Sequence, residues 1–168
     1  MLKFFVPEYR FNSFRDITAE FLVSIGVKGV VLDIDNTLLP YEIPTPTEEV
    51  KEWLESLKKN GISASLVSNN NKERVELFNN EIGLPAFSKA GKPFKKNVLR
   101  ALSEMGVSAD CSVLIGDQVF TDVWAAHNAG IRAILVPPIK DKTDLLTRFK
   151  RWLEIPVLRM YDKMNEGE

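Results

Sequence analysis

Residues 30–40 read VVLDIDNTLLP, an apolar run that closes on two acidic residues, Asp33 and Asp35. A short, β-branched and nearly continuous apolar run is typical of a strand covered on both faces, as in a parallel sheet. A buried carboxylate is destabilising unless it is paired or holds a metal ion. This stretch therefore predicts a central strand that ends in a functional site.

Similar apolar runs predict the rest of a sheet. Strands are expected at residues 29–34, 62–68, 111–116 and 131–136, with a weaker one near 86–87. Helices are expected at residues 48–59, capped by Thr47, at 72–80, at 93–105, with Pro93 in the first turn, and at 122–128. This alternation predicts an α/β fold, a three-layer Rossmann-like sandwich with a mostly parallel central sheet. We expect one domain over residues 1–168, with its core at about 28–137, a helical N-terminal leader and an amphipathic C-terminal helix.

Composition narrows the class of protein. The net charge is −1 at 168 residues, so no overall basic field indicates a nucleic-acid partner. The single cysteine, Cys111, excludes an internal disulfide and a cysteine zinc cluster, and is expected to be a small core residue. The apolar start is interrupted at Pro7, Glu8 and Arg10, and no apolar run approaches the roughly 20 residues that span a bilayer. A cytoplasmic protein is expected.

Short polar residues follow three of the predicted strands. In open parallel sheets, ligands bind at the carboxyl ends of the strands. Asp33 and Asp35 flank one apolar residue, so on a regular strand both point the same way and repel unless a cation lies between them. With Asp117 they form an oxygen-rich pocket that suits magnesium. The residues at the three strand ends are Asp33 with Asp35, Ser68 with Asn69 and Asn70, and Asp117.

This set of residues suits phosphoryl transfer. A carboxylate beside a metal ion can accept a phosphoryl group as an aspartyl phosphate. A second carboxyl group can protonate the leaving oxygen and later deprotonate water. Phosphoryl transfer also needs positive charge and hydrogen-bond donors. Lys92 is the candidate cation, and the Ser68 hydroxyl and the Asn69 backbone N–H are candidate donors.

Four motifs in order resemble those of the haloacid dehalogenase-like phosphatase superfamily. They are DIDNT at 33–37, SNN at 68–70, GKP at 91–93 and GDQVFTD at 116–122. The resemblance implies Asp33 as the nucleophile and Asp35 as the general acid and base. It implies that Thr37 and Ser68 bind phosphate and that Lys92 neutralises its charge. The Asp-x-Asp pattern favours a phosphatase over a dehalogenase.

The same resemblance implies a magnesium cofactor. Its ligands would be the Asp33 carboxylate, the Asp35 backbone carbonyl and Asp117, and Asp122 would support the site through water or by orienting Lys92. His127 is expected to be an ordinary helix-face residue.

The spacing of the motifs bears on the substrate. The gaps at residues 38–61 and 69–91 are too short for a cap domain, so we expect an open site that suits a large substrate. That substrate is a phosphoprotein, a nucleic-acid end or a phospholipid head group. The C-terminal segment is expected to be a helix that lies either on an anionic membrane or on the domain core. Its expected apolar face is Leu145, Leu146, Phe149, Trp152 and Leu153, ringed by Lys142, Arg148, Lys150 and Arg151.

The leader FRDITAEFLVSIGVKGVVLDIDNTL, residues 14–38, resembles the YqeG family of bacterial phosphatases. That family is similar to the mitochondrial phosphatidylglycerophosphatase. The resemblance implies a magnesium-dependent phosphomonoesterase for a phospholipid such as phosphatidylglycerophosphate, with possible peripheral contact at the inner face of the membrane. The alternatives are a phosphatase for a protein or nucleotide substrate and a catalytically silent binding module. The oligomeric state is left open.

Overall fold

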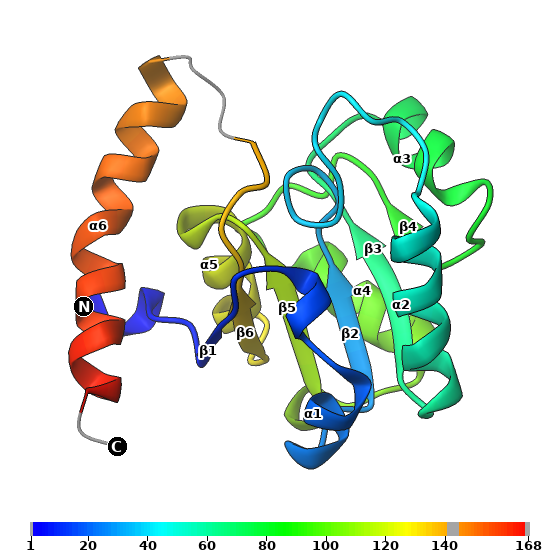
Figure 1. The fold of residues 1–168 in the computed structure, drawn as a ribbon, viewed down its shortest axis with the longest axis horizontal. Helices are drawn as coiled ribbons and strands as arrows, with labels where there is room; N and C mark the ends of the chain where they lie inside the picture. The colour runs from blue at the N-terminus through cyan, green and yellow to red at the C-terminus, as the bar shows by residue number, and fades with distance from the viewer. Residues whose placement is uncertain (1, 141–144, 167–168) are drawn as a thin grey trace.

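The computed structural model describes residues 2–140 and 145–166, and a parallel sheet of six strands forms its centre (Figure 1). The strand order is β1-β6-β5-β2-β3-β4, with parallel pairing throughout. The strands are β1 (Tyr9–Arg10), β2 (Gly29–Leu32), β3 (Ser63–Val67), β4 (Ala86–Phe87), β5 (Ser112–Gly116) and β6 (Arg132–Leu135). The predicted α/β sandwich with a parallel sheet is confirmed.

Helices cover both faces of this sheet. The α-helices are α1 (Ala19–Ser24), α2 (Glu48–Lys59), α3 (Lys72–Asn79), α4 (Lys96–Met105), α5 (Trp124–Asn128) and α6 (Leu145–Asn165). Shorter turns are η1 (Leu2–Phe5), η2 (Phe14–Asp16), η3 (Ala109–Cys111) and the π-helical turn η4 (Val119–Val123). The predicted cap is confirmed, because the Thr47 side chain accepts the Val50 N–H at the start of α2.

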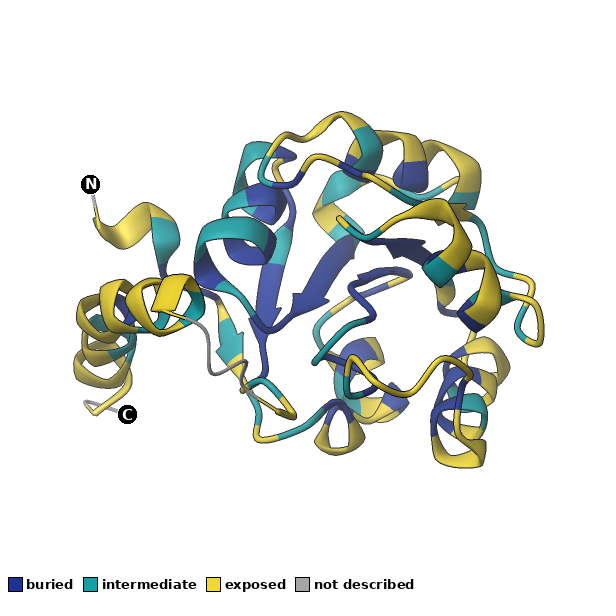
Figure 2. Ribbon diagram, turned by 90° about the horizontal axis from the view of Figure 1, so that it is seen from above, coloured by how far each residue is buried: buried dark blue, intermediate teal, exposed yellow. Residues whose placement is uncertain are grey.

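Two hydrophobic cores lie on opposite faces of the sheet. Successive residues of a strand point to opposite faces, and in β2 Leu32 joins one core while Val31 joins the other. The first core is completed by η2, α1, α2 and α3, and the second by α4, α5, η4 and part of α6. Figure 2 shows the central strands buried along their length. This double cover explains why β2 reads as a continuous apolar run.

Three local predictions were wrong. The helix expected from Pro93 begins at Lys96, because Pro93 lies in a turn closed by the Phe94 N–H on the Gly91 carbonyl, and the Phe94 side chain is 75% exposed. The helix expected from residue 122 begins at Val119 with the π-helical turn. Cys111 is only half-buried, because it ends η3 at the rim of the sheet.

The C-terminal helix α6 packs on the domain, but not with its expected apolar face. Val157 enters the second core, and Arg10 pairs with Asp162 at 2.7 Å. By contrast, the expected face is mostly exposed, with Leu145 at 82% and Trp152 at 63%. Figure 2 shows this outer surface in the exposed colour. Of the basic residues predicted around that face, Lys142 lies outside the described residues.

Among residues 2–140 and 145–166, no helix combines the length and the apolar character that crossing a membrane requires.

Candidate active site

The carboxyl ends of three adjacent strands bring the predicted residues together. Asp33 follows β2, Ser68 follows β3 and Asp117 follows β5, and all three are buried. Thr37 lies in the loop after β2, where its hydroxyl is 3.3 Å from Asp33 Oδ2 and 3.4 Å from Asp117 Oδ1. The parallel order β5-β2-β3 thus places groups from distant parts of the chain around one point.

Lys92 is a buried cation at the centre of this site. Its Nζ lies 2.8 Å from Asp33 Oδ1 and 2.6 Å from Asp122 Oδ1. The Asn69 side chain holds the lysine backbone in place, with Oδ1 accepting the Lys92 N–H at 2.8 Å and Nδ2 donating to the Lys92 carbonyl at 3.0 Å. The sequence predicted a role only for the Asn69 backbone N–H, as a donor to phosphate. The contact between the Asn69 side chain and the Lys92 backbone was not predicted.

Asp122 occupies space that only a glycine leaves open. A Cβ at Gly116 would lie 2.3 Å from Asp122 Cγ, which no side chain tolerates. The other carboxylate oxygen of Asp122 accepts the Gln118 N–H at 3.1 Å. The π-helical turn and Gly116 together allow an acidic side chain to be buried beside Lys92.

Asp35 points to partners of its own. Its Oδ2 accepts from Asn70 Nδ2 at 2.8 Å, and its Oδ1 accepts from Arg74 Nε at 3.0 Å. Arg74 also donates to the backbone carbonyls of Ile43 and Pro44, both at 2.8 Å. Neither residue was assigned a role from the sequence, although Asn70 stands in the SNN motif and Arg74 lies in the first turn of α3.

A third residue without a role assigned from the sequence is Arg151 of α6. Its Nη2 lies 2.7 Å from Asp117 Oδ2, and its Nη1 donates to the Asp117 carbonyl at 2.8 Å. The sequence places Arg151 among the residues ringing the apolar face, and the structure corrects this. Helical periodicity alone gave no signal, because the two residues lie 34 positions apart.

The acidic residues of the site fit a divalent metal ion. Among the described residues, Asp33, Asp117 and Asp122 each place a carboxylate oxygen within 4.8 Å of the other two, and all are buried. The pKa of Asp33 is raised to about 6 and that of Asp117 to about 8, mainly by burial and in addition by the neighbouring carboxylates. Oxygen-only ligands of this kind are those that magnesium binds. An ion here would relieve the repulsion between the three side chains.

These pKa shifts predict how stability depends on pH in the metal-free protein. Asp33 and Asp117 bind protons more tightly when folded, because each has a pKa near 3.8 when unshifted. The free energy of unfolding should therefore fall as pH rises from about 4 to about 8. Chemical unfolding in chelator at several pH values measures this slope. Asp117→Asn should flatten it between pH 6 and 8, and an unchanged slope would contradict the assignment.

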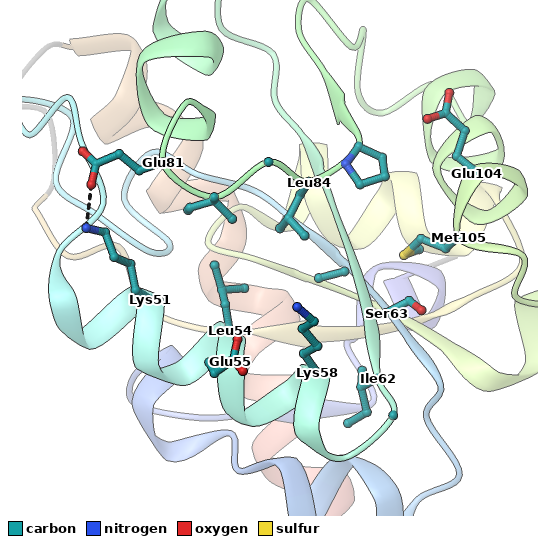
Figure 3. Close-up of a pocket in the computed structure, with 15 residues that line it drawn as sticks. Lys51, Leu54, Glu55, Lys58, Ile62, Ser63, Glu81, Leu84, Glu104 and Met105 are labelled. Atoms are coloured by element: carbon teal, nitrogen blue, oxygen red, sulfur yellow. Dashed lines mark ion pairs between the residues drawn. The ribbon is translucent and has the colours of Figure 1, made fainter.

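A separate groove lies away from this site. It has a volume of about 660 Å³ and lies between α2, β3 and the segment before β4 (Figure 3). Figure 3 shows Leu54, Ile62 and Leu84 along it, with the Lys51–Glu81 ion pair at one side. None of its lining residues belongs to the acidic site, so its size gives no reason to move the catalytic centre there.

Comparison with known proteins identifies the family. The family model described as haloacid dehalogenase-like hydrolase matches residues 13–136. Probable phosphatase YqeG of Bacillus subtilis (strain 168) is 40% identical over 156 residues, which is 93% of this chain and 91% of that protein. The chain therefore belongs to the haloacid dehalogenase-like hydrolases. The predicted enzyme class, a phosphatase of this family, is confirmed.

Two more distant proteins are also similar. Phosphatidylglycerophosphate phosphatase 1, chloroplastic/mitochondrial, of Arabidopsis thaliana is 25% identical over 169 residues, and the match covers 95% of this chain but only 49% of that protein. The cobalt-bound deoxy-D-mannose-octulosonate 8-phosphate phosphatase of Haemophilus influenzae superposes with a TM-score of 0.53 at 17% identity. That superposition covers 83% of this chain and 91% of the other, and it supports the fold alone.

Proposed function

We propose that this protein is a magnesium-dependent phosphomonoesterase that acts through an aspartyl phosphate on Asp33, with a phospholipid monoester such as phosphatidylglycerophosphate as its substrate. The observation that carries the proposal is the buried Asp33 carboxylate, held by Lys92 next to Asp117 and Asp122. A buried acidic cluster of this kind opposes folding, so a structural role explains it poorly.

The proposed reaction has two displacements. A carboxylate oxygen of Asp33 attacks phosphorus, the ester P–O bond breaks, and the leaving oxygen takes a proton from Asp35. Asp35 then removes a proton from water, which attacks the same phosphorus, releases inorganic phosphate and regenerates Asp33. Arg74 and Asn70 fix the orientation of the Asp35 side chain.

The remaining residues handle charge. Lys92 offsets the negative charge on Asp33 and on the transferred phosphoryl group, while the Thr37 and Ser68 hydroxyls donate hydrogen bonds to its oxygens. Bound magnesium would add positive charge and orient the phosphoryl group. Its ligands would be the Asp33 and Asp117 carboxylates and the Asp35 backbone carbonyl, with Asp122 in support.

Replacing Asp117 tests the metal site. Asp117→Ala should weaken magnesium binding and slow phosphate release, because it removes one charged ligand. Calorimetric titration with magnesium and a chromogenic phosphatase assay measure the two effects. For the wild-type enzyme, calcium should substitute poorly because it prefers more ligands and a looser geometry. Full activity in excess chelator would refute the metal assignment.

Two observations support a lipid substrate. The Arabidopsis relative is named for phosphatidylglycerophosphate. The exposed face of α6 carries the apolar Trp152 beside the basic Arg148 and Lys150. Helices that lie on anionic bilayers have this combination of side chains. Figure 1 shows the first turns of α6 at the same end of the molecule as the loop after β2. Arg151, which lies between these exposed residues in the sequence, reaches Asp117, so this part of α6 lies next to the catalytic site.

Vesicle binding tests this contact. Each basic residue near an anionic surface contributes about 1 kcal/mol, so Arg148→Gln with Lys150→Gln should weaken binding to anionic vesicles by roughly tenfold or more at low salt. Activity on a small soluble ester should stay the same. Trp152→Ala should also weaken binding, with little change in melting temperature because its side chain is 63% exposed.

Failure of the wild type to sediment with anionic vesicles would contradict the membrane contact. A soluble macromolecule would then be the favoured substrate.

A phosphate-release screen addresses the substrate directly. It compares phosphatidylglycerophosphate in mixed micelles with phosphopeptides and nucleotides at equal phosphate concentration. We expect the highest kcat/KM on the lipid. A preference for phosphopeptides or nucleotides would refute the lipid assignment, and no turnover of any ester would favour a silent binding module.

A further inference from the structure

We propose that Arg151 and Glu154 of α6 are positioning residues for the metal site, which they brace from outside the catalytic motifs. The inference rests on the proposed function. It assigns the C-terminal helix a part in metal binding that is separate from any contact with a membrane.

Arg151 fixes the orientation of the Asp117 carboxylate. Its guanidinium group donates to Oδ2 at 2.7 Å and to the backbone carbonyl of the same residue at 2.8 Å. The other oxygen of Asp117, Oδ1, lies on the side of Thr37. Oδ2 of Asp117 is thus held by Arg151, while Oδ1 lies near the Thr37 hydroxyl, which also contacts Asp33 Oδ2. Hydrogen bonds to the distal atoms of metal ligands commonly orient them in this way.

Glu154 holds the arginine and the next part of the loop. Its Oε2 lies 3.0 Å from Arg151 Nη1, and its Oε1 accepts the Val119 N–H at 2.9 Å. Glu154 is 5% exposed, so an ion pair and a backbone hydrogen bond offset the cost of burying its charge. Val119 begins the π-helical turn that carries Asp122.

The two residues therefore clamp both sides of Gln118, whose own N–H bonds to Asp122. The loop that carries both Asp117 and Asp122 is bonded to α6 at its first and third positions. The helix itself is anchored by the buried Val157 and by the Arg10–Asp162 ion pair. Arg151 and Glu154 therefore belong to a helix whose position on the domain is fixed by other contacts.

The test measures magnesium affinity by calorimetry, together with the dependence of phosphatase activity on magnesium concentration. Loss of hydrogen-bond partners to metal ligands typically weakens metal binding by roughly 10- to 100-fold. We expect a loss of this size for Arg151→Gln and a smaller one for Arg151→Lys, which keeps the charge but not both hydrogen bonds. Glu154→Gln should fall between these variants and the wild type. Melting temperatures show that the variants are folded.

Arg148→Gln is the matched control, because Arg148 lies on the same helix and is exposed. It should leave magnesium affinity unchanged. Unchanged or tighter magnesium binding in a folded Arg151→Gln protein would overturn the inference, since the guanidinium would then have no effect on the ion or would repel it. If the wild type bound no magnesium, the proposed metal site would fail together with this inference. Normal wild-type binding with unaffected Arg151 variants would refute the inference alone.

Discussion

Asp33→Asn should lower phosphate release by roughly ten thousandfold or more while leaving the protein folded. The substitution removes the attacking carboxylate oxygen and one negative charge of the metal site. The amide still offers an oxygen to Lys92 Nζ, which lies 2.8 Å from Oδ1 in the native protein. Phosphate release from a chromogenic ester measures the loss, and calorimetric titration separates it from loss of magnesium.

The same variant should be at least as stable as the wild type in chelator. Burial raises the pKa of Asp33 to about 6, so its ionised form opposes folding at neutral pH. Asp16→Asn, at an exposed position, is the control for a neutral carboxyl replacement and should change neither property. Substantial turnover by folded Asp33→Asn protein would rule out the aspartyl-phosphate mechanism.

Lys92→Met should damage both stability and catalysis. The side chain keeps similar length and apolar bulk, but Asp33 and Asp122 lose the cation that lies 2.8 and 2.6 Å away. Breaking a buried ion pair by removing one partner costs about 3–5 kcal/mol of unfolding free energy. Urea unfolding in chelator at pH 8 measures this loss. Turnover should fall because the lysine ammonium group no longer helps to neutralise the phosphoryl group.

Part of the stability should return at pH 5, because the stranded carboxylates can then take up protons. Lys95→Met is the matched control, since Lys95 is exposed and three positions away. It should behave like the wild type. A Lys92→Met protein with native stability and turnover would show that the buried cation is dispensable.

The sheet and most of the acidic site could be predicted because their signals are local. Each predicted strand is a short apolar run, and the residues Asp33, Ser68 and Asp117 directly follow such runs. Parallel pairing then makes their convergence a consequence of topology. Thr37 and Lys92 were assigned to the site because they stand in motifs that occur in the same order as those of the superfamily.

The missed contacts depend on tertiary packing. Arg74 and Arg151 look like ordinary surface cations on helices, and only the way α3 and α6 dock places them against Asp35 and Asp117. The periodicity of α6 identified its larger apolar face, Leu145 to Leu153, but that face is the exposed one. Packing uses Val157 with Leu158, Met160 and Tyr161 instead, together with the buried Glu154. Both sides of the helix carry apolar residues, so a rule that turns apolar residues inward cannot choose between them.

The clamp from α6 also sets an order of events during synthesis. Arg151 is added 34 residues after Asp117, so at roughly 5–20 residues per second several seconds separate the two. Until Arg151 is added, the Asp117 carboxylate has no arginine partner, although every motif residue is already part of the chain. A released chain that ends at residue 150 is therefore expected to bind magnesium more weakly than the full chain, because the proposed metal site is completed only by the last helix.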